Sequence, residues 1–293
     1  MLTNETENMP TKLLDQINQH GFVLIKQLIE PSLILKLQRL CQCLIDDTES
    51  QHANQQQLDN IAITQNDKGY VVSRVNNLFQ FQPKFAYLLA HTGLMDSVEA
   101  IIGESVLPSY ESLVIKHPLD RHGFDWHRDM GDRSQEPVIT VGIYLDEAKV
   151  DQGALKVIPQ SHTSQLSVSE LKAQLTNKKS KSVDVAATAG DVIIHHVNTV
   201  HASDRQASSA IRRTIYFEFR AISHFINNPR FSSCWIEKRQ ALISQVKGLS
   251  AEKMQNNVQL PSDFYAEQIR IEPAEYGISQ VDTSRNHICS DCY

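Results

Sequence analysis

The chain has 293 residues, of which 41% are hydrophobic and 21% are charged, and its formal net charge is -6 at pH 7. This composition is typical of a globular protein with a sizeable core, and we expect one domain over residues 1–293, because β-rich folds often reach this length as one unit. The acidic balance and the lack of a long Lys or Arg run argue against nucleic acid as a partner. No apolar run approaches the about 20 residues that cross a bilayer, and the polar N-terminus lacks the pattern of a secretory signal. We expect a cytoplasmic protein with no membrane partner, present as a monomer or homodimer.

The five cysteines have no spacing that resembles a disulfide framework, and we expect them to be reduced. Cys289 and Cys292 form a CxxC pair, a spacing that occurs in zinc sites. No second pair of ligands lies near them in the sequence, so zinc has no complete site there.

The first part of the sequence, residues 1–109, is predicted to be mainly helical. Apolar residues recur there at spacings of three and four, which is the period of an amphipathic helix, and Pro31 is well suited to a helix start. Gly103 is expected to end the last of these helices. The predicted elements are helices at 11–20, 31–47 and 84–102 and a short strand at 21–25.

From residue 110 the pattern changes to short β-branched runs between turn residues. Many short strands with no helices between them favour an antiparallel sandwich or jelly roll. After residue 222 the pattern becomes helical again, most clearly at 232–247. We therefore expect a mainly β fold with flanking helices, in which a β core at 110–221 is followed by a helical part at 222–293. The predicted strands are 110–117, 137–146, 153–159, 182–187, 191–198 and 211–221.

Three residues form a candidate metal site. His127 and Asp129 are two positions apart, and in an extended segment this spacing points both side chains to the same side. His201 follows a predicted strand, and a β core can bring it to the same place. Two imidazoles and one carboxylate leave positions open on an ion, an arrangement that suits non-haem iron(II).

The context of these residues is more specific than the residues alone. His127-Arg128-Asp129 is followed by Asp151-Gln152-Gly153 and Pro159-Gln160-Ser161-His162, and then by Gly190-Asp191, His201-Ala202-Ser203 and Arg212. This succession resembles the phytanoyl-CoA dioxygenase family of Fe(II)/2-oxoglutarate-dependent oxygenases. The resemblance is clearest over residues 110–221.

The resemblance implies a double-stranded β-helix of the cupin type, in which His127, Asp129 and His201 hold iron(II). It also implies that Arg212, eleven residues after His201, pairs with the far carboxylate of 2-oxoglutarate. A guanidinium suits this role because its planar fork meets a carboxylate through two charge-assisted hydrogen bonds. The implied reaction uses 2-oxoglutarate and O2 as co-substrates, oxidises a C–H bond of a small-molecule substrate, and releases succinate and CO2.

Strand alternation leaves the choice between Arg212 and Arg213 open. Arg212 shares a face with Thr214, Tyr216 and Glu218, whereas Arg213 shares a face with Ile215, Phe217 and Phe219. Either face could line the site. The family spacing favours Arg212, and Arg213 is kept as the alternative.

The strand at 137–146 has an apolar face, and Thr140, Gly142 and Tyr144 lie on its other face. Thr140 is a candidate to donate a hydrogen bond to 2-oxoglutarate, as is Lys116 at the end of the strand 110–117, and Arg74 is a weaker candidate. The position that corresponds to Gly142 is often Trp in the family, so we expect a larger cavity here.

The reaction type is constrained by Asp129, since chlorinating members of the family replace this carboxylate with a small residue. Hydroxylation is therefore expected, while desaturation and cyclisation stay open. Two alternatives are a cupin-like metalloenzyme that does not use 2-oxoglutarate and a non-catalytic barrel that binds a small molecule. For His195 and His196, which lie in the predicted strand before His201, ordinary strand packing is the expected role.

Overall fold

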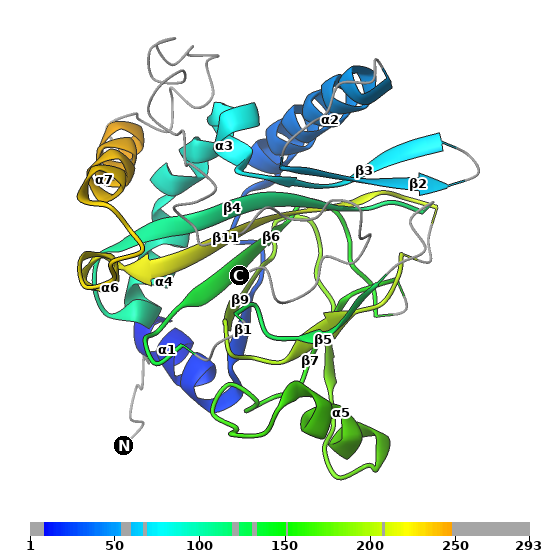
Figure 1. The fold of residues 1–293 in the computed structure, drawn as a ribbon, viewed down its shortest axis with the longest axis vertical. Coiled ribbons are helices and arrows are strands. Elements are labelled where there is room, and N and C mark those ends of the chain that lie inside the picture. The colour runs from blue at the N-terminus through cyan, green and yellow to red at the C-terminus, as the bar shows by residue number, and fades with distance from the viewer. Residues whose placement is uncertain are drawn as a thin grey trace, which may run out of the picture.

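The computed structural model describes residues 9–53, 60–66, 69–118, 123–130, 134–150, 152–206 and 209–247. Within this part of the chain the strands form two antiparallel sheets (Figure 1). The major sheet has the order β1-β9-β6-β11-β4-β3-β2, and the minor sheet has the order β5-β10-β7-β8. The predicted class, mainly β with flanking helices and a jelly-roll arrangement, is confirmed, although no ladder between described strands closes the two sheets into a barrel.

The strands of the major sheet are β1 (Phe22–Ile25), β2 (Ile61–Asn66), β3 (Gly69–Asn76), β4 (Val106–Lys116), β6 (Ile139–Tyr144), β9 (Val192–His196) and β11 (Arg212–Ala221). Those of the minor sheet are β5 (Phe124–His127), β7 (Leu155–Val157), β8 (Val183–Val185) and β10 (His201–Ser203). The helices are α1 (Met9–His20), α2 (Pro31–Ala53), α3 (Leu78–Phe81), the 3-10 helix η1 (Pro83–Ala90), α4 (Thr92–Ile102), α5 (Val168–Thr176), α6 (Ile222–Ile226) and α7 (Ser233–Lys247). Among these helices none combines the length and the apolar character that spanning a membrane requires.

The strand predicted at 21–25 is β1, which pairs with β9 at one edge of the major sheet. The N-terminal part is nevertheless less helical than predicted, because the hairpin of β2 and β3 extends the other edge beyond β4. The helix predicted at 84–102 is also divided. His91 separates η1 from α4, and its Nδ1 accepts a hydrogen bond of 3.1 Å from the backbone N–H of Leu94, which caps the new helix. Gly103 ends α4 at a φ of 86°, as predicted.

Helix α5 interrupts the predicted succession of strands between β7 and β8. It begins with a capping box, in which Ser167 accepts from the N–H of Glu170 and the Glu170 side chain accepts from the N–H of Ser167. Reciprocal capping of this kind satisfies two backbone donors that a helix start otherwise leaves unpaired. The Ser-x-x-Glu spacing was a usable signal for this helix in the sequence.

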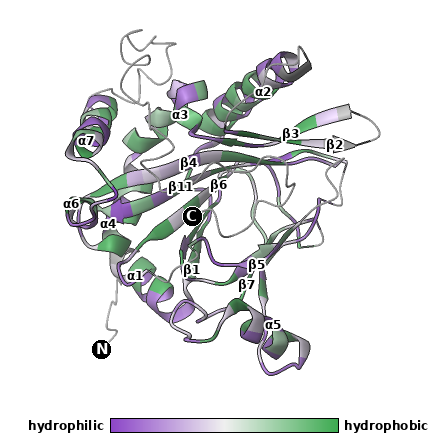
Figure 2. Ribbon diagram, in the orientation of Figure 1, coloured by the Kyte–Doolittle hydropathy of each residue, from purple (hydrophilic) through white to green (hydrophobic). Residues whose placement is uncertain are grey.

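The apolar faces of the central strands pack against the helices rather than against the minor sheet. In β6 and β11 the residues of these faces are fully buried in the large core, with the helices as their partners. In Figure 2 the helices α1, α2 and α7 carry both hydrophobic and hydrophilic turns, as expected of helices that cover one face of a sheet. The opposite, more polar face of the major sheet is left to face the minor sheet. The buried residues of the packed faces are Ile139, Val141, Ile143, Ile215, Phe217 and Phe219.

The described cysteines form no disulfide. Cys41 is buried, whereas Cys43 and Cys234 are exposed. The expectation of reduced thiols stays a prediction, since Cys289 and Cys292 lie outside the described residues. Burial raises the pKa of the Cys41 thiol far above its ordinary value, which makes this thiol unreactive.

A buried ion pair fixes α7 to the helix-covered face of the major sheet. Glu111 on β4 accepts from Arg239 at 3.2 Å and 3.4 Å, and the two residues are 0% and 3% exposed. The guanidinium also lies over the ring of Trp235, 5.2 Å from its centroid. Each charge is taken out of water and depends on the other.

We predict that Glu111→Ala lowers the free energy of unfolding by about 3–5 kcal/mol, because it leaves the Arg239 charge buried without its counter-ion. Denaturant unfolding measures this change. The matched control is Glu147→Ala, since Glu147 pairs with Lys149 at 3.1 Å with both side chains about half exposed, and such pairs contribute about 1 kcal/mol or less. Equal losses in the two variants would contradict the prediction.

Candidate metal centre

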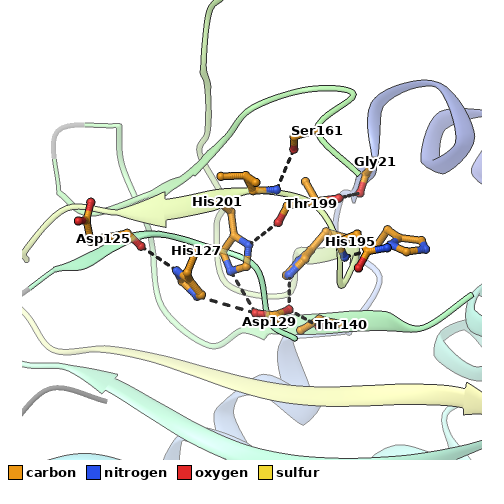
Figure 3. Close-up of polar contacts among 12 residues, drawn as sticks. Gly21, Asp125, His127, Asp129, Thr140, Ser161, His195, Thr199 and His201 are labelled. Carbon is orange, nitrogen blue, oxygen red and sulfur yellow. Dashed lines mark hydrogen bonds and ion pairs between the residues drawn. The ribbon is translucent and has the colours of Figure 1, made fainter. Parts of the chain in front are cut away.

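Strand pairing in the minor sheet brings the predicted metal ligands together. His127 ends β5 and His201 begins β10, and the two are direct partners in the antiparallel register. Their ring centroids are 4.2 Å apart. Asp129 follows two residues after His127, and one ligand atom from each of the three residues lies within 4.8 Å of the others. Figure 3 shows the three side chains pointing toward one another.

The atoms that converge are the Nε2 atoms of the two imidazoles and one carboxylate oxygen. Oδ1 of Asp129 lies 3.3 Å from Nε2 of His201 and 3.8 Å from Nε2 of His127. The other ring nitrogens face backbone carbonyls, with Nδ1 of His127 at 2.7 Å from Asp125 O and Nδ1 of His201 at 2.9 Å from Thr199 O. A carbonyl only accepts, so each Nδ1 carries the hydrogen and each Nε2 presents a lone pair to the centre.

The segment before His201 is held at both sides of the site. The Thr199 hydroxyl donates to Gly21 O at 2.8 Å, and the backbone N–H of Val200 donates to Ser161 Oγ at 2.7 Å (Figure 3). These bonds connect His201 to the start of β1 and to the turn after β7. The Pro159-Gln160-Ser161-His162 segment therefore has a structural role, as a support of the third ligand.

Arg128, the middle residue of the His-Arg-Asp segment, fixes the position of the two candidate ligands on either side of it. Arg128 is buried, and its guanidinium donates to Asn198 O at 2.9 Å and to Leu166 O at 3.0 Å. The backbone N–H of Asp129 donates to Val197 O at 3.1 Å. The turn that carries His127 and Asp129 is thus tied to the loop between β9 and β10.

Burial and the neighbouring charges set the ionisation of the site. Burial, with the charge of His201 added, lowers the pKa of His127 to about 4. Burial also disfavours the charged form of Asp129, but the charges of His201 and His195 and their hydrogen bonds hold the pKa of Asp129 well below its usual value. Burial acts against a charge on His201 too, yet the Asp129 carboxylate raises the pKa of His201 above its usual value. The site therefore holds a stable carboxylate at neutral pH.

This donor set fits a divalent transition metal. Two imidazole nitrogens with fixed tautomers and one ionised carboxylate oxygen lie on one side of a common centre, and the cavity occupies the other side. Two His and one carboxylate with open positions is the pattern of non-haem iron(II) sites. The residues present thus fit iron(II).

A cavity extends from the three ligands between the two sheets, with about 670 Å³ of space when its open mouth is included. Residues of both sheets line it, so the site lies at the junction of the sheets. The lining residues beyond the ligands include Arg74, Tyr110, Ser112, Phe124, Tyr216, Glu218 and Arg212.

Of the two neighbouring arginines, Arg212 faces the cavity and Arg213 faces away from it. Arg212 is 3% exposed, its guanidinium lies 5.9 Å from the centroid of the Tyr144 ring, and its Nη1 donates to Gly153 O. Arg213 forms a two-bond ion pair with Asp146, at 2.8 Å for each bond. The pair lies on the helix side, because Arg213 also donates to Gln38 O on α2 at 3.1 Å.

The other two candidate cofactor contacts already have partners. The Thr140 hydroxyl donates to Asp129 Oδ2 at 2.5 Å, so it contacts a metal ligand. Lys116 is 3% exposed, and its ammonium group donates to Ser203 Oγ at 2.6 Å and to Asp204 O. Lys116 is not among the residues that line the cavity, whereas Arg74 is.

Sequence reasoning missed two features of the cavity wall. His195, expected to be ordinary packing, places its Nε2 2.8 Å from Asp129 Oδ2. Gly142, expected to enlarge the cavity, instead makes room for Tyr216, since a Cβ at this position would lie 2.9 Å from Cε1 of the Tyr216 ring. Alternation gives a usable signal for Tyr216, which shares the cavity face of β11 with Arg212.

Comparison with known proteins agrees with the fold. The sequence matches the family described as Phytanoyl-CoA dioxygenase (PhyH) over residues 17–214, more than half of the chain. The chain belongs to the phytanoyl-CoA dioxygenase family. The match includes all three candidate ligands and Arg212, and it extends the resemblance toward the N-terminus, to α1.

The individual relatives of this phytanoyl-CoA dioxygenase family chain have low sequence identity to it. A curated protein of Stutzerimonas stutzeri, "Probable alpha-ketoglutarate-dependent hypophosphite dioxygenase", is 22% identical over 166 residues, which are 52% of this chain and 58% of that protein. Among solved structures, AviO1 from Streptomyces viridochromogenes Tue57 is 26% identical with a TM-score of 0.62, covering 72% of this chain and 94% of that one. EctD from S. alaskensis with bound Fe is 20% identical with a TM-score of 0.63, covering 76% and 80%. The likeness to EctD concerns the fold.

We predict that Arg128→Met lowers the free energy of unfolding by about 3 kcal/mol, because the carbonyls of Asn198 and Leu166, the first of them buried, lose a charged donor. It should also weaken the binding of Mn(II), since the turn that holds Asp129 is released. Denaturant unfolding and calorimetric titration measure the two effects. Arg39→Met, at an exposed position of α2, is the control and should change neither quantity. An Arg128 variant as stable as the control would contradict the role given to this side chain.

Proposed function

We propose that this protein is an Fe(II)- and 2-oxoglutarate-dependent oxygenase that hydroxylates a C–H bond of a small-molecule metabolite and releases succinate and CO2. The observation that carries the proposal is the presence of Arg212 in the same cavity as His127, Asp129 and His201. A metal site alone would fit many enzymes. The addition of a buried guanidinium gives the cavity a place for a second carboxylate, as 2-oxoglutarate requires.

In this proposal His127, Asp129 and His201 hold iron(II) through two Nε2 atoms and Oδ1. Iron(II), when bound with 2-oxoglutarate and O2, supplies the oxidising chemistry. The chain supplies the geometry: the carbonyls of Asp125 and Thr199 fix the imidazole tautomers, and the walls between the sheets limit the access of water. The substrate is oriented by the remaining cavity residues.

Arg212 is proposed to bind the far carboxylate of 2-oxoglutarate. Its Nε is buried and has no hydrogen-bond partner among the described residues, so the guanidinium keeps donor capacity for a ligand. The ring of Tyr144 supports the flat face of the guanidinium and leaves its edge for a carboxylate. The proposed roles of Thr140 and Lys116 at 2-oxoglutarate are weaker, because both side chains already donate to protein oxygens.

The wall near the metal ligands supports a small, polar substrate. Glu218 pairs in register with Thr140, and its Oε1 accepts from Ser109 Oγ at 2.5 Å and from Arg220 Nε at 2.8 Å. Ser112 is 1% exposed, lines the cavity and has a hydroxyl with no partner among the described residues. Buried polar groups of this kind favour a substrate that forms hydrogen bonds over a purely apolar chain.

Asp129 supports one restriction on the reaction type. Its carboxylate occupies the ligand position that a halide would need, so hydroxylation is proposed over halogenation. The alternative of a cupin-like metalloenzyme without 2-oxoglutarate does not explain why the Arg212 guanidinium lines the cavity. The alternative of a non-catalytic barrel does not account for three ligands with fixed tautomers.

We predict that Arg212→Met weakens the binding of 2-oxoglutarate to the anaerobic Fe(II) protein by about 100-fold, because a charge-assisted pair with the carboxylate is lost. The visible absorption of the Fe(II)–2-oxoglutarate complex measures the affinity. Arg213→Met is the matched control and should retain the affinity of the unchanged protein, although it loses the ion pair with Asp146. A larger effect at Arg213 than at Arg212 would reverse the assignment.

We also predict that the Fe(II)-loaded protein releases succinate in proportion to the oxidation of a metabolite, and that Asp129→Ala abolishes this release because one ligand is missing. A panel of polar metabolites with isotopically labelled O2 tests both points by mass spectrometry. Labelled oxygen in the product indicates hydroxylation, and an oxidised product without the label would replace hydroxylation with desaturation or cyclisation. No consumption of 2-oxoglutarate with any compound would count against the proposed function.

A further inference from the structure

The second oxygen of the Asp129 carboxylate has its own binding site in the protein. Oδ2 accepts from the Thr140 hydroxyl at 2.5 Å and lies 2.8 Å from Nε2 of His195. In Figure 3 these two side chains approach the carboxylate from the side opposite His127. Oδ2 is therefore held from the major sheet, while Oδ1 faces the two imidazoles of the minor sheet.

The two donors come from adjacent strands and act at the same level of the major sheet. Thr140 on β6 and His195 on β9 are direct partners in the antiparallel register, so their side chains leave the same face side by side. A carboxylate oxygen has two lone pairs, and two donors on Oδ2 occupy both. The plane of the carboxylate is thereby fixed, and Oδ1 keeps its lone pairs for an ion.

The burial of His195 leaves one ring nitrogen without a hydrogen-bond partner among the described residues, which ordinary packing does not explain. It is 2% exposed, and because Asp129 accepts at Nε2, that nitrogen carries the hydrogen. Nδ1 is then a bare acceptor, and it is buried without a partner among the described residues. Buried polar atoms are nearly always paired in native proteins, and an exception indicates a task for the rest of the side chain. In this structure that task is the hydrogen bond to Asp129.

We propose that Thr140 and His195 are positioning residues that hold Asp129 as a ligand through one oxygen only. The proposal rests on the iron site of the proposed function. A carboxylate bound through both oxygens would take one more position on the ion. With Oδ2 held back, three protein atoms bind the ion, and the remaining positions suffice for a chelating co-substrate and O2. His195 is not itself a ligand, since the converging group consists of His127, Asp129 and His201.

The first test measures metal affinity in the full chain without co-substrate, with Mn(II) as the probe and calorimetric titration as the method. We expect His195→Phe and Thr140→Val each to weaken Mn(II) binding by about 10–100-fold, the range usual when a ligand loses its supporting hydrogen bond. His195→Gln and Thr140→Ser keep a donor at each place and should restore most of the affinity. A purely structural role would not distinguish the donor-keeping variants from the others.

Two neighbouring positions provide matched controls. His196→Phe changes the next residue of β9, whose side chain points to the other face and accepts from the backbone of Asn198 at 3.0 Å. Thr214→Val removes a buried hydroxyl of the major sheet that has no partner among the described residues. Both controls should bind Mn(II) with the affinity of the unchanged protein. Circular dichroism before each titration identifies variants that fail to fold, and for those the donor-keeping pair decides.

The second test examines the number of positions left on the ion. In His195→Phe the released carboxylate is expected to bind the ion through both oxygens, which raises the coordination number. Because a higher coordination number weakens the visible absorption of Co(II), the Co(II)-loaded variant should absorb less than the Co(II)-loaded unchanged protein. Unchanged Mn(II) affinity and Co(II) absorption in His195→Phe and Thr140→Val would overturn the proposal, and so would equal losses in the controls. Failure of the unchanged protein to bind Mn(II) or Co(II) would instead overturn the proposed function on which it rests.

Discussion

The partly buried carboxylate of Asp129 is the constraint on which the rest of the structure depends. An anion between two sheets is stable only if donors surround it, because its transfer from water is costly. Here Thr140 and His195 of the major sheet donate to one oxygen, and the other oxygen lies 3.3 Å from Nε2 of His201 on the minor sheet. The faces that enclose it must therefore carry polar residues. The apolar faces of the same strands are then left for the helices, and this is the observed layering, in which the large core lies between the major sheet and its helices.

The same alternation explains which parts of the site could be predicted from the sequence. The pair His127 and Asp129 is local, so its spacing was sufficient to propose a shared ion. Arg212 and Arg213 could not be separated by pattern, because alternation divides the strand into two faces without saying which one meets the helices. The structure separates them through Asp146, which engages Arg213 on the helix side.

The elements that the sequence did not predict share a cause, since their stability comes from long-range pairing. β3 is stabilised by its ladder with β4, and β2 by its ladder with β3, so neither strand carries a strong signal of its own. The role of His195 was likewise hidden, because the choice between packing and a bond to Asp129 depends on a contact between residues 66 positions apart. The capped helix α5 is different, because its signal was local and present in the sequence.

The candidate site lies where the two sheets meet, and its polar bonds are also connections between the sheets. The backbone N–H of Asp129 and the guanidinium of Arg128 both donate to the loop that joins β9 of the major sheet to β10 of the minor sheet. An ion bound by His127, Asp129 and His201 would add a further link at the same place, because Asp129 is held from the major sheet while both imidazoles belong to the minor sheet. The separation of the sheets and the geometry of the ligands therefore cannot vary independently. A substitution that shifts one sheet relative to the other changes the site even when it contacts no ligand.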